Sequence, residues 1–151
     1  MENLDDLTSV VCRILVHLLV EDGVDQPVIV DLRYTSADPY AVVMTFHPSP
    51  DARVRWVIGR DLLLGGRNRL VGVGDVQIWP SQHASLGKVC IGLRPRGNKE
   101  AVVVVASGRS LDAFLRRTLV VVPVGTEERH LDMDGTVQQL LSGPDKPDMT
   151  R

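Results

Sequence analysis

Strict alternation of apolar and polar residues in three short runs constrains the fold of this chain more than any other feature. Residues 28–34, 40–47 and 53–58 each place apolar side chains at every second position, which is the period of a half-buried β-strand. Stretches rich in Pro, Asp and Ser separate the runs and favour tight turns. Strands joined by tight turns pair in antiparallel order, so the sequence predicts an antiparallel meander. The predicted inward residues are Val28, Val30, Leu32 and Tyr34, then Val42, Met44 and Phe46, then Val54, Trp56 and Ile58.

Further strands extend this sheet. Three later segments are predicted strands, at residues 73–79, 88–94 and 100–106. Residues 8–20 are ambiguous, because Val10, Ile14 and Leu18 fit one face of a helix as well as an alternating strand. The density of β-branched residues in this segment favours a strand.

One segment has clear helical periodicity. In residues 110–119 the apolar side chains recur at helical spacing and form one stripe, as in a helix that packs on a core. Asp112 and Arg116 lie four residues apart on the other side and are predicted to form an ion pair. We expect this helix to cover one face of the sheet.

Two shorter helical segments complete the prediction. Residues 60–64 are expected to form a helical turn that Gly65 and Gly66 end. A further helix is expected to begin at Asp134 as its N-cap and to end before Gly143 and Pro144. The fold class is therefore α+β, with antiparallel sheets of about seven to eight strands packed with two to three helices. Residues 1–142 are predicted to form a single domain, and residues 143–151 a disordered tail.

Charge is unevenly distributed along the 151 residues. Residues 51–117 carry a balance of +7, the rest of the chain carries −9, and the formal net charge is −2. Such asymmetry either orients a partner by long-range attraction or is neutralised within the fold. The acidic N-terminus and the short apolar run at residues 10–20 match neither a signal peptide nor a membrane span. We expect a soluble, cytoplasmic protein.

Reactive groups are scattered, and none forms a recognisable catalytic or cofactor motif. Gly72 and Gly74 lack the third glycine of a dinucleotide fingerprint and precede a strand, so they indicate a turn. Asp132 and Asp134, near His130, suit helix capping better than metal binding. The two cysteines, Cys12 and Cys90, have neither metal-type spacing nor the number of a disulfide framework. The sequence therefore predicts no enzyme, no cofactor and no metal.

Binding of nucleic acid is also weakly supported. Arginines in the basic middle of the chain have the charge to contact phosphates. Single-strand binders also need aromatic side chains on which bases stack, and only 4% of the residues are aromatic. Several of those are predicted to lie in the core. We therefore expect nucleic acid to be an unlikely partner.

Seven ordered motifs together resemble one known family. They are LRYTSADPYAV at 32–42, TFH at 45–47, WVIGRDLLLGG at 56–66, GVGDVQIWPS at 72–81, VCIGLRP at 89–95, SLDAFLRRT at 110–118 and VPVGTEERHLDMD at 122–134. The chain resembles the SsgA-like regulators of sporulation and cell division in filamentous actinobacteria, over roughly residues 8–142. The segments around Trp79, Cys90 and Glu127 are most similar to the SsgB branch.

The resemblance implies a non-enzymatic role in sporulation-specific cell division. It implies an adaptor that associates with the tubulin-like protein FtsZ, and with other SsgA-like or divisome proteins, in the cytoplasm at division septa. It also implies a Whirly-like fold and a homo-oligomer, which we expect to be a trimer. Two alternatives stay open: a Whirly-like module that binds single-stranded nucleic acid, and a family branch that acts in spore-wall maturation.

An adaptor of this kind works through surface residues. We expect Arg116 and Arg117 to point outward from the helix at 110–119, and the loop around Arg60 to be exposed. These three arginines, Arg60, Arg116 and Arg117, are the predicted partner-binding residues. The alternative for each is an arginine that only contacts solvent.

Overall fold

The computed structural model describes residues 9–19, 25–81, 87–95 and 101–130. This part of the chain contains eight strands and two helices, followed by a helical turn at residues 127–130. The strands are β1 (Ser9–Leu19), β2 (Asp25–Thr35), β3 (Ala41–Ser49), β4 (Ala52–Gly59), β5 (Val71–Val73), β6 (Val76–Pro80), β7 (Lys88–Leu93) and β8 (Val102–Ser107). The helices are α2 (Arg60–Gly66) and α3 (Gly108–Val121).

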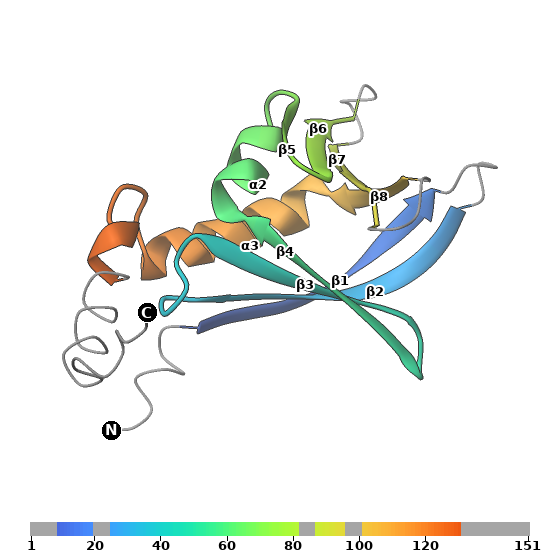
Figure 1. Cartoon of the computed structure of the whole chain (residues 1–151), viewed down its shortest axis with the longest axis horizontal. Coiled ribbons are helices and arrows are strands. Elements are labelled where there is room, and N and C mark those ends of the chain that lie inside the picture. The colour runs from blue at the N-terminus through green and yellow to red at the C-terminus, as the bar shows by residue number, and fades with distance from the viewer. Residues whose placement is uncertain (1–8, 20–24, 82–86, 96–100, 131–151) are drawn as a thin grey trace, which may run out of the picture.

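The eight strands form one curled sheet in the order β4-β3-β2-β1-β8-β7-β6-β5. Every pair of neighbouring strands is antiparallel. The predicted α+β class and the antiparallel meander are therefore confirmed. The curl brings the two halves of the sheet around a common interior, and both helices lie on that inner side (Figure 1).

Alternation along the strands fills this interior as predicted. The inward residues of β2 and β3 are 5% exposed or less. Val54 of β4 faces the same way but is 47% exposed. The reason is its position, because β4 is the last strand on its side of the sheet and has a neighbour only in β3.

The ambiguous segment at residues 8–20 is strand β1 over its described residues. It pairs with β2 along its whole length and with β8 at its end. Residues 71–80 form a hairpin, β5 and β6, where the sequence predicted a single strand. Gly74 lies in the turn of this hairpin with a φ of +59°, which only glycine adopts without strain. The turn is therefore confirmed at Gly74, whereas Gly72 lies within β5 and pairs with Gln77 of β6.

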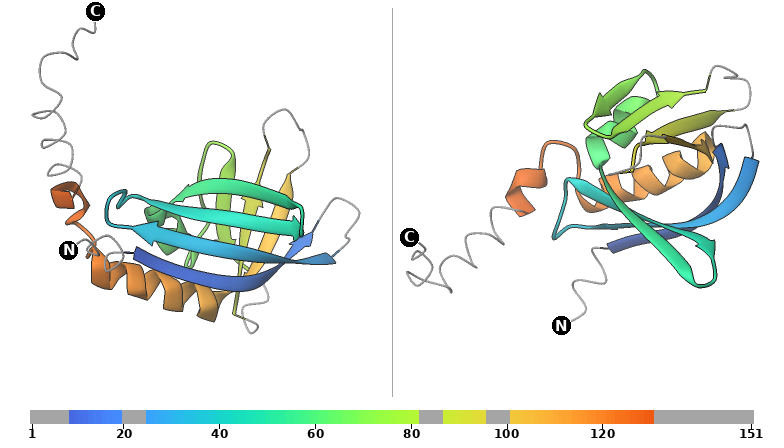
Figure 2. Two further views of the ribbon diagram at one scale, coloured as in Figure 1. Left: turned by 90° about the horizontal axis from the view of Figure 1, so that it is seen from below. Right: turned by 45° about the vertical axis from the view of Figure 1, so that its right-hand side comes forward.

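Helix α3 begins two residues earlier than predicted. The side chain of Ser107 accepts a hydrogen bond from the backbone N–H of Ser110 at 3.2 Å, which is the usual role of an N-cap serine. Leu111, Phe114 and Leu115 are buried under the sheet. The helix contacts β1, β2, β7 and β8, and it runs in the direction of β1 (Figure 2).

Helix α2 continues through both glycines that were expected to end it. A Cβ atom on Gly66 would lie 2.2 Å from Cγ2 of Ile78, so the glycine lets α2 touch strand β6. The predicted helix at residues 60–64 therefore stops two residues short, because α2 includes both glycines and ends at Gly66. Close packing against β6 requires the second glycine. The helix predicted from Asp134 and the tail at 143–151 lie outside the described residues.

Candidate functional site

Arg60 is buried, although the sequence placed it on the surface. Its side chain is 1% exposed and forms an ion pair with Glu127, with Nη2 and Oε2 2.8 Å apart. The guanidinium lies over the ring of Tyr34 at 5.0 Å from its centroid, a cation–π contact. The expectation that Arg60 faces a partner is therefore wrong, since in this fold the side chain cannot reach one.

The role of Arg60 is to tie α2 to the end of α3. Its Nη1 donates hydrogen bonds to the carbonyl oxygens of Thr118 at 3.1 Å and Val122 at 2.8 Å. The carbonyl oxygen of Thr118 also accepts the backbone N–H of Val122 at 2.9 Å, so Arg60 is its second donor. A cation at a helix C-terminus also interacts favourably with the helix dipole. Arg60 therefore fixes where α3 ends and how it lies against α2.

Glu127 completes this buried cluster. Burial raises the pKa of its carboxyl, but backbone hydrogen bonds, the bond from Arg60 and the charge of Arg60 together lower the pKa below its usual value. One backbone donor is the N–H of Gly125, 2.9 Å from Oε1. The carboxylate is therefore held ionised opposite Arg60, and the cluster is structural.

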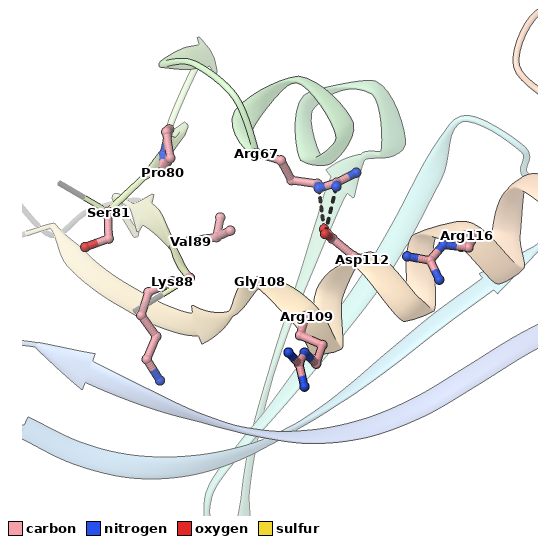
Figure 3. Close-up of a pocket in the computed structure, with 10 residues that line it drawn as sticks. Arg67, Pro80, Ser81, Lys88, Val89, Gly108, Arg109, Asp112 and Arg116 are labelled. Atoms are coloured by element: carbon pink, nitrogen blue, oxygen red, sulfur yellow. Dashed lines mark hydrogen bonds and ion pairs between the residues drawn. The ribbon is translucent and has the colours of Figure 1, made fainter. Parts of the chain in front are cut away.

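A basic groove of about 470 Å³ lies beside the N-terminal half of α3 (Figure 3). Its charged side chains come from three elements that are distant in the sequence. They are Arg67 after α2, Lys88 of β7, and Arg109, Asp112 and Arg116 of α3. Among the described residues that line the groove, four positive charges and one negative charge give a net charge of +3.

Asp112 pairs with Arg67 across this groove. Nη2 of Arg67 donates to Oδ2 of Asp112 at 2.7 Å, and Nε contacts Oδ1. The predicted pair of Asp112 with Arg116 is therefore wrong, because Arg67 reaches the carboxylate from α2. Among the described residues Arg109, Arg116 and Lys88 form no hydrogen bond or ion pair through their side chains.

Two backbone segments in contact form the base of the groove. The N–H of Gly108 donates to the carbonyl oxygen of Gly87 at 2.7 Å, and a Cβ on Gly108 would lie 2.6 Å from that oxygen. A side chain at this position would push α3 away from β7. Gly108 therefore brings Lys88 and Arg109, each of which directly follows one of these glycines, to the same side of the molecule.

Arg116 and Arg117 are both exposed, as predicted, but they face different surroundings. Arg116 lines the groove, whereas Nη1 of Arg117 makes a long hydrogen bond of 3.5 Å to the carbonyl oxygen of Val11 in β1. Successive residues of a helix point about 100° apart, which separates the two side chains. Lys88 and Arg109 were not predicted to be partner-binding residues. A signal was present in the sequence, because each of them directly follows a glycine, Gly87 or Gly108.

The outer face of the sheet is a second notable surface. Val11, Leu15, Ile29 and Val57 are 41–57% exposed there, although they belong to regular strands. Exposed apolar side chains gathered on one face mark interaction sites in soluble proteins.

A polar cluster lies among these apolar residues. Asp31 accepts hydrogen bonds from Nε of Arg13 at 2.8 Å and Nη2 of Arg13 at 3.1 Å, and its Oδ2 is 2.9 Å from Nε2 of His47. The bond to Arg13, with smaller contributions from His47, lowers the pKa of Asp31 to about 2 against the opposing effect of burial. Asp31 therefore stays ionised at neutral pH and holds Arg13 against the sheet.

Side chains that could bind a metal or react as thiols are dispersed over the described residues. Within the described ranges no group of three or more His, Cys, Asp or Glu side chains has metal-binding geometry. Cys12 and Cys90 are free, and burial raises the pKa of the Cys90 thiol, which disfavours the reactive thiolate. No described helix is long and apolar enough to cross a bilayer.

Comparison with known proteins identifies the family. The family model described as the Streptomyces sporulation and cell division protein SsgA matches residues 28–127. The chain belongs to the SsgA family. The sporulation-specific cell division protein SsgB of Streptomyces coelicolor is 43% identical over 136 residues, which cover 89% of this chain and 97% of that protein. The resemblance seen in the sequence, including its SsgB character, is therefore confirmed.

Solved structures share the fold of this SsgA-family protein. An SsgA-like sporulation-specific cell division protein from Thermobifida fusca superposes with a TM-score of 0.78 at 36% identity, over 87% of this chain and 94% of that one. A structure from work relating SsgB mutations to longitudinal cell division in sporulating Streptomyces coelicolor gives a TM-score of 0.75 at 46% identity, over 82% and 95% of the two chains.

Proposed function

We propose that this SsgA-family chain is a non-enzymatic regulator of sporulation-specific cell division that acts as an oligomeric adaptor on FtsZ. The observation that carries the proposal is similarity over nearly the full length to proteins named for sporulation-specific cell division. Other SsgA-like or divisome proteins are further proposed partners. The proposed place of action is the cytoplasm at division septa.

The basic groove beside α3 supports an adaptor role. Arg109, Arg116 and Lys88 present positive charge at a concave surface, and their side chains are not bound to other described residues. Complementary charge speeds and orients the association of two proteins. The groove therefore fits a carboxylate-rich surface of the partner, with Arg116 as the predicted contact residue. Arg117 would then contact a partner only if that partner also reached the β1 side of α3.

The outer face of the sheet supports the oligomeric part of the proposal. A second copy of the chain would cover the exposed side chains of Val11, Leu15 and Ile29, and a closed trimer is the state we propose. Several linked copies of one groove raise the effective concentration of binding sites along a polymer. An oligomer would therefore bind an FtsZ filament more tightly than a single copy.

Co-sedimentation with polymerised FtsZ tests this proposal. The purified chain should pellet with the polymer in a saturable, concentration-dependent way and should stay in the supernatant without polymer. Absence from the pellet over a range of protein concentrations would exclude the FtsZ adaptor and favour the spore-wall branch of the family.

Binding of single-stranded nucleic acid is the second candidate, because the groove is basic and the predicted scaffold is Whirly-like. None of the described residues that line the groove is aromatic, so these residues do not supply the stacking that single-strand binders use. Salt-dependent retention of single-stranded DNA by the purified protein would support this candidate. No retention at low salt would exclude it.

A further inference from the structure

Within the described part of the chain, strand β4 is a free edge of the sheet. The order of strands places β4 at one end, where only β3 pairs with it (Figure 2). In an antiparallel pair, alternate residues point their N–H and C=O groups away from the partner strand. Among the described residues, no backbone hydrogen bond reaches the outer side of residues 52–58. These groups can therefore pair with an additional strand.

An apolar cavity opens on the inner face of this same strand. It has a volume of about 200 Å³, and Val54 and Trp56 of β4 line it together with Phe46, Leu93 and Val102. Of these lining residues, Val54 has a side chain that is 47% exposed to solvent. Side chains that point inward from a strand added to β4 would enter this cavity, and its lining fits aliphatic or aromatic groups.

The outer face of β4 carries positive charge. Arg53 and Arg55 alternate with the two cavity residues and are exposed. Neither forms an ion pair or hydrogen bond through its side chain with another described residue. Opposite charges on neighbouring strands attract, and like charges directly opposite each other repel. The edge therefore favours an acidic strand and disfavours the β4 edge of a second copy.

We propose that β4 docks an extended segment of another protein as a ninth strand. Main-chain hydrogen bonds to the free edge hold the segment, as in other cases of β-strand addition. Its apolar side chains occupy the cavity at alternate positions, and its carboxylates face Arg53 and Arg55 between them. This surface is separate from the groove beside α3, and the inference does not depend on FtsZ being the partner.

The two tryptophans of the chain make a direct test possible. Trp79→Phe leaves Trp56, which lines the cavity, as the only tryptophan. The probe is a capped eight-residue peptide that alternates glutamate and leucine. We expect a saturable change in the emission of Trp56, and slower amide hydrogen exchange at alternate residues of β4 in the wild-type protein. A peptide that alternates lysine and leucine should bind at least about 10-fold more weakly, a difference of about 1.4 kcal/mol.

Charge reversal provides the matched comparison. The double variant Arg53→Glu, Arg55→Glu should reverse the preference and bind the lysine peptide more tightly. No emission change with either peptide up to about 1 mM, or equal binding of both peptides, would overturn the proposal. So would amide protection confined to the groove beside α3.

Amide hydrogen exchange of β4 in the protein without peptide shows whether a second copy or another segment of the same chain already pairs with the β4 edge. Protection of β4 that rises with protein concentration would show that a second copy binds there. Protection at every concentration would show that another segment of the same chain covers the edge. Either result would contradict docking of a separate partner segment.

Discussion

The guanidinium of Arg60 joins helix α2 to the end of α3 and to Glu127 from a fully buried position. A surface loop was expected around it because arginine is rarely buried without a partner, and its partner Glu127 is 67 positions away. Local periodicity contains no information about a contact at that distance. The inward residues of β2 and β3 were predictable because alternation depends only on near neighbours.

The buried ion pair makes a prediction about stability. Glu127→Ala leaves the guanidinium of Arg60 buried without its counter-charge, so the free energy of unfolding should fall by about 3–5 kcal/mol. The double variant Arg60→Met, Glu127→Leu removes both charges and should be more stable than Glu127→Ala. Urea denaturation measures both. The exposed neighbour provides the control, since Glu128→Ala should change stability by no more than about 0.5 kcal/mol. A loss equal to that of the control would show that the pair is not a structural lock.

The lowered pKa of Asp31 leads to a prediction about how the stability of the fold depends on pH. Its pKa in the folded state is about 2, below the ordinary value of 3.8. A carboxyl with a lowered pKa stabilises the fold above its unfolded pKa, and this contribution is lost as the pH falls through the folded pKa. Between about pH 4 and pH 2, Asp31→Asn should therefore lose less stability than the wild type does. Urea midpoints measured across this range give the two slopes, and identical slopes would contradict the assignment.

Helix α2 shows which features of an element were accessible from the sequence. Its start after β4 was predicted, and its end was placed two residues early, because paired glycines usually stop a helix. Here Gly66 lies against Ile78 of β6, a contact that is set by tertiary structure. The strand nature of β1 was favoured only by its β-branched residues, because apolar side chains occur on both of its faces.

The two adjacent glycines of α2 allow a matched test. Gly66→Ala would place a methyl group 2.2 Å from Cγ2 of Ile78, and we expect a loss of about 2 kcal/mol from overpacking. Gly65→Ala would place its methyl group 3.4 Å from Cγ1 of Val71 and should be neutral or slightly stabilising, because alanine favours helices. Thermal or urea denaturation distinguishes them. Equal stability of the two variants would mean that α2 does not pack closely on β6.

At the scale of the whole molecule, the groove and the two exposed surfaces depend on the curl of the sheet. Arg67, Lys88 and Arg109 lie on separate elements, and only the order of strands brings them together. The family resemblance was the basis of the proposed function. Neither the resemblance nor the spacing of residues in the sequence predicted that this groove exists or where it lies. Arg116 was found from the sequence because it lies on the polar side of a clearly amphipathic helix.

The exposed apolar side chains on the outer face of the sheet lead to a prediction about the oligomeric state of the protein. Leu15→Glu places a charge among exposed apolar side chains, so it should shift the proposed oligomer toward the monomer while the fold persists. Val124→Glu is the matched control, since Val124 is 62% exposed but lies after α3 and away from the sheet. Sedimentation velocity reports the distribution of species. A wild-type protein that is monomeric at every concentration would contradict the proposed trimer.

The most direct test of the central claim is pelleting with FtsZ polymer by charge-reversed variants. Arg116→Glu and Arg109→Glu change the groove, whereas Arg129→Glu makes the same change at an exposed position outside it. The account predicts that the wild type and Arg129→Glu pellet equally and that both groove variants pellet less. It also predicts that added salt weakens wild-type pelleting, because salt screens exposed charges. A wild type that never pellets, or groove variants that pellet as well as the wild type, would contradict an adaptor that binds FtsZ through this groove.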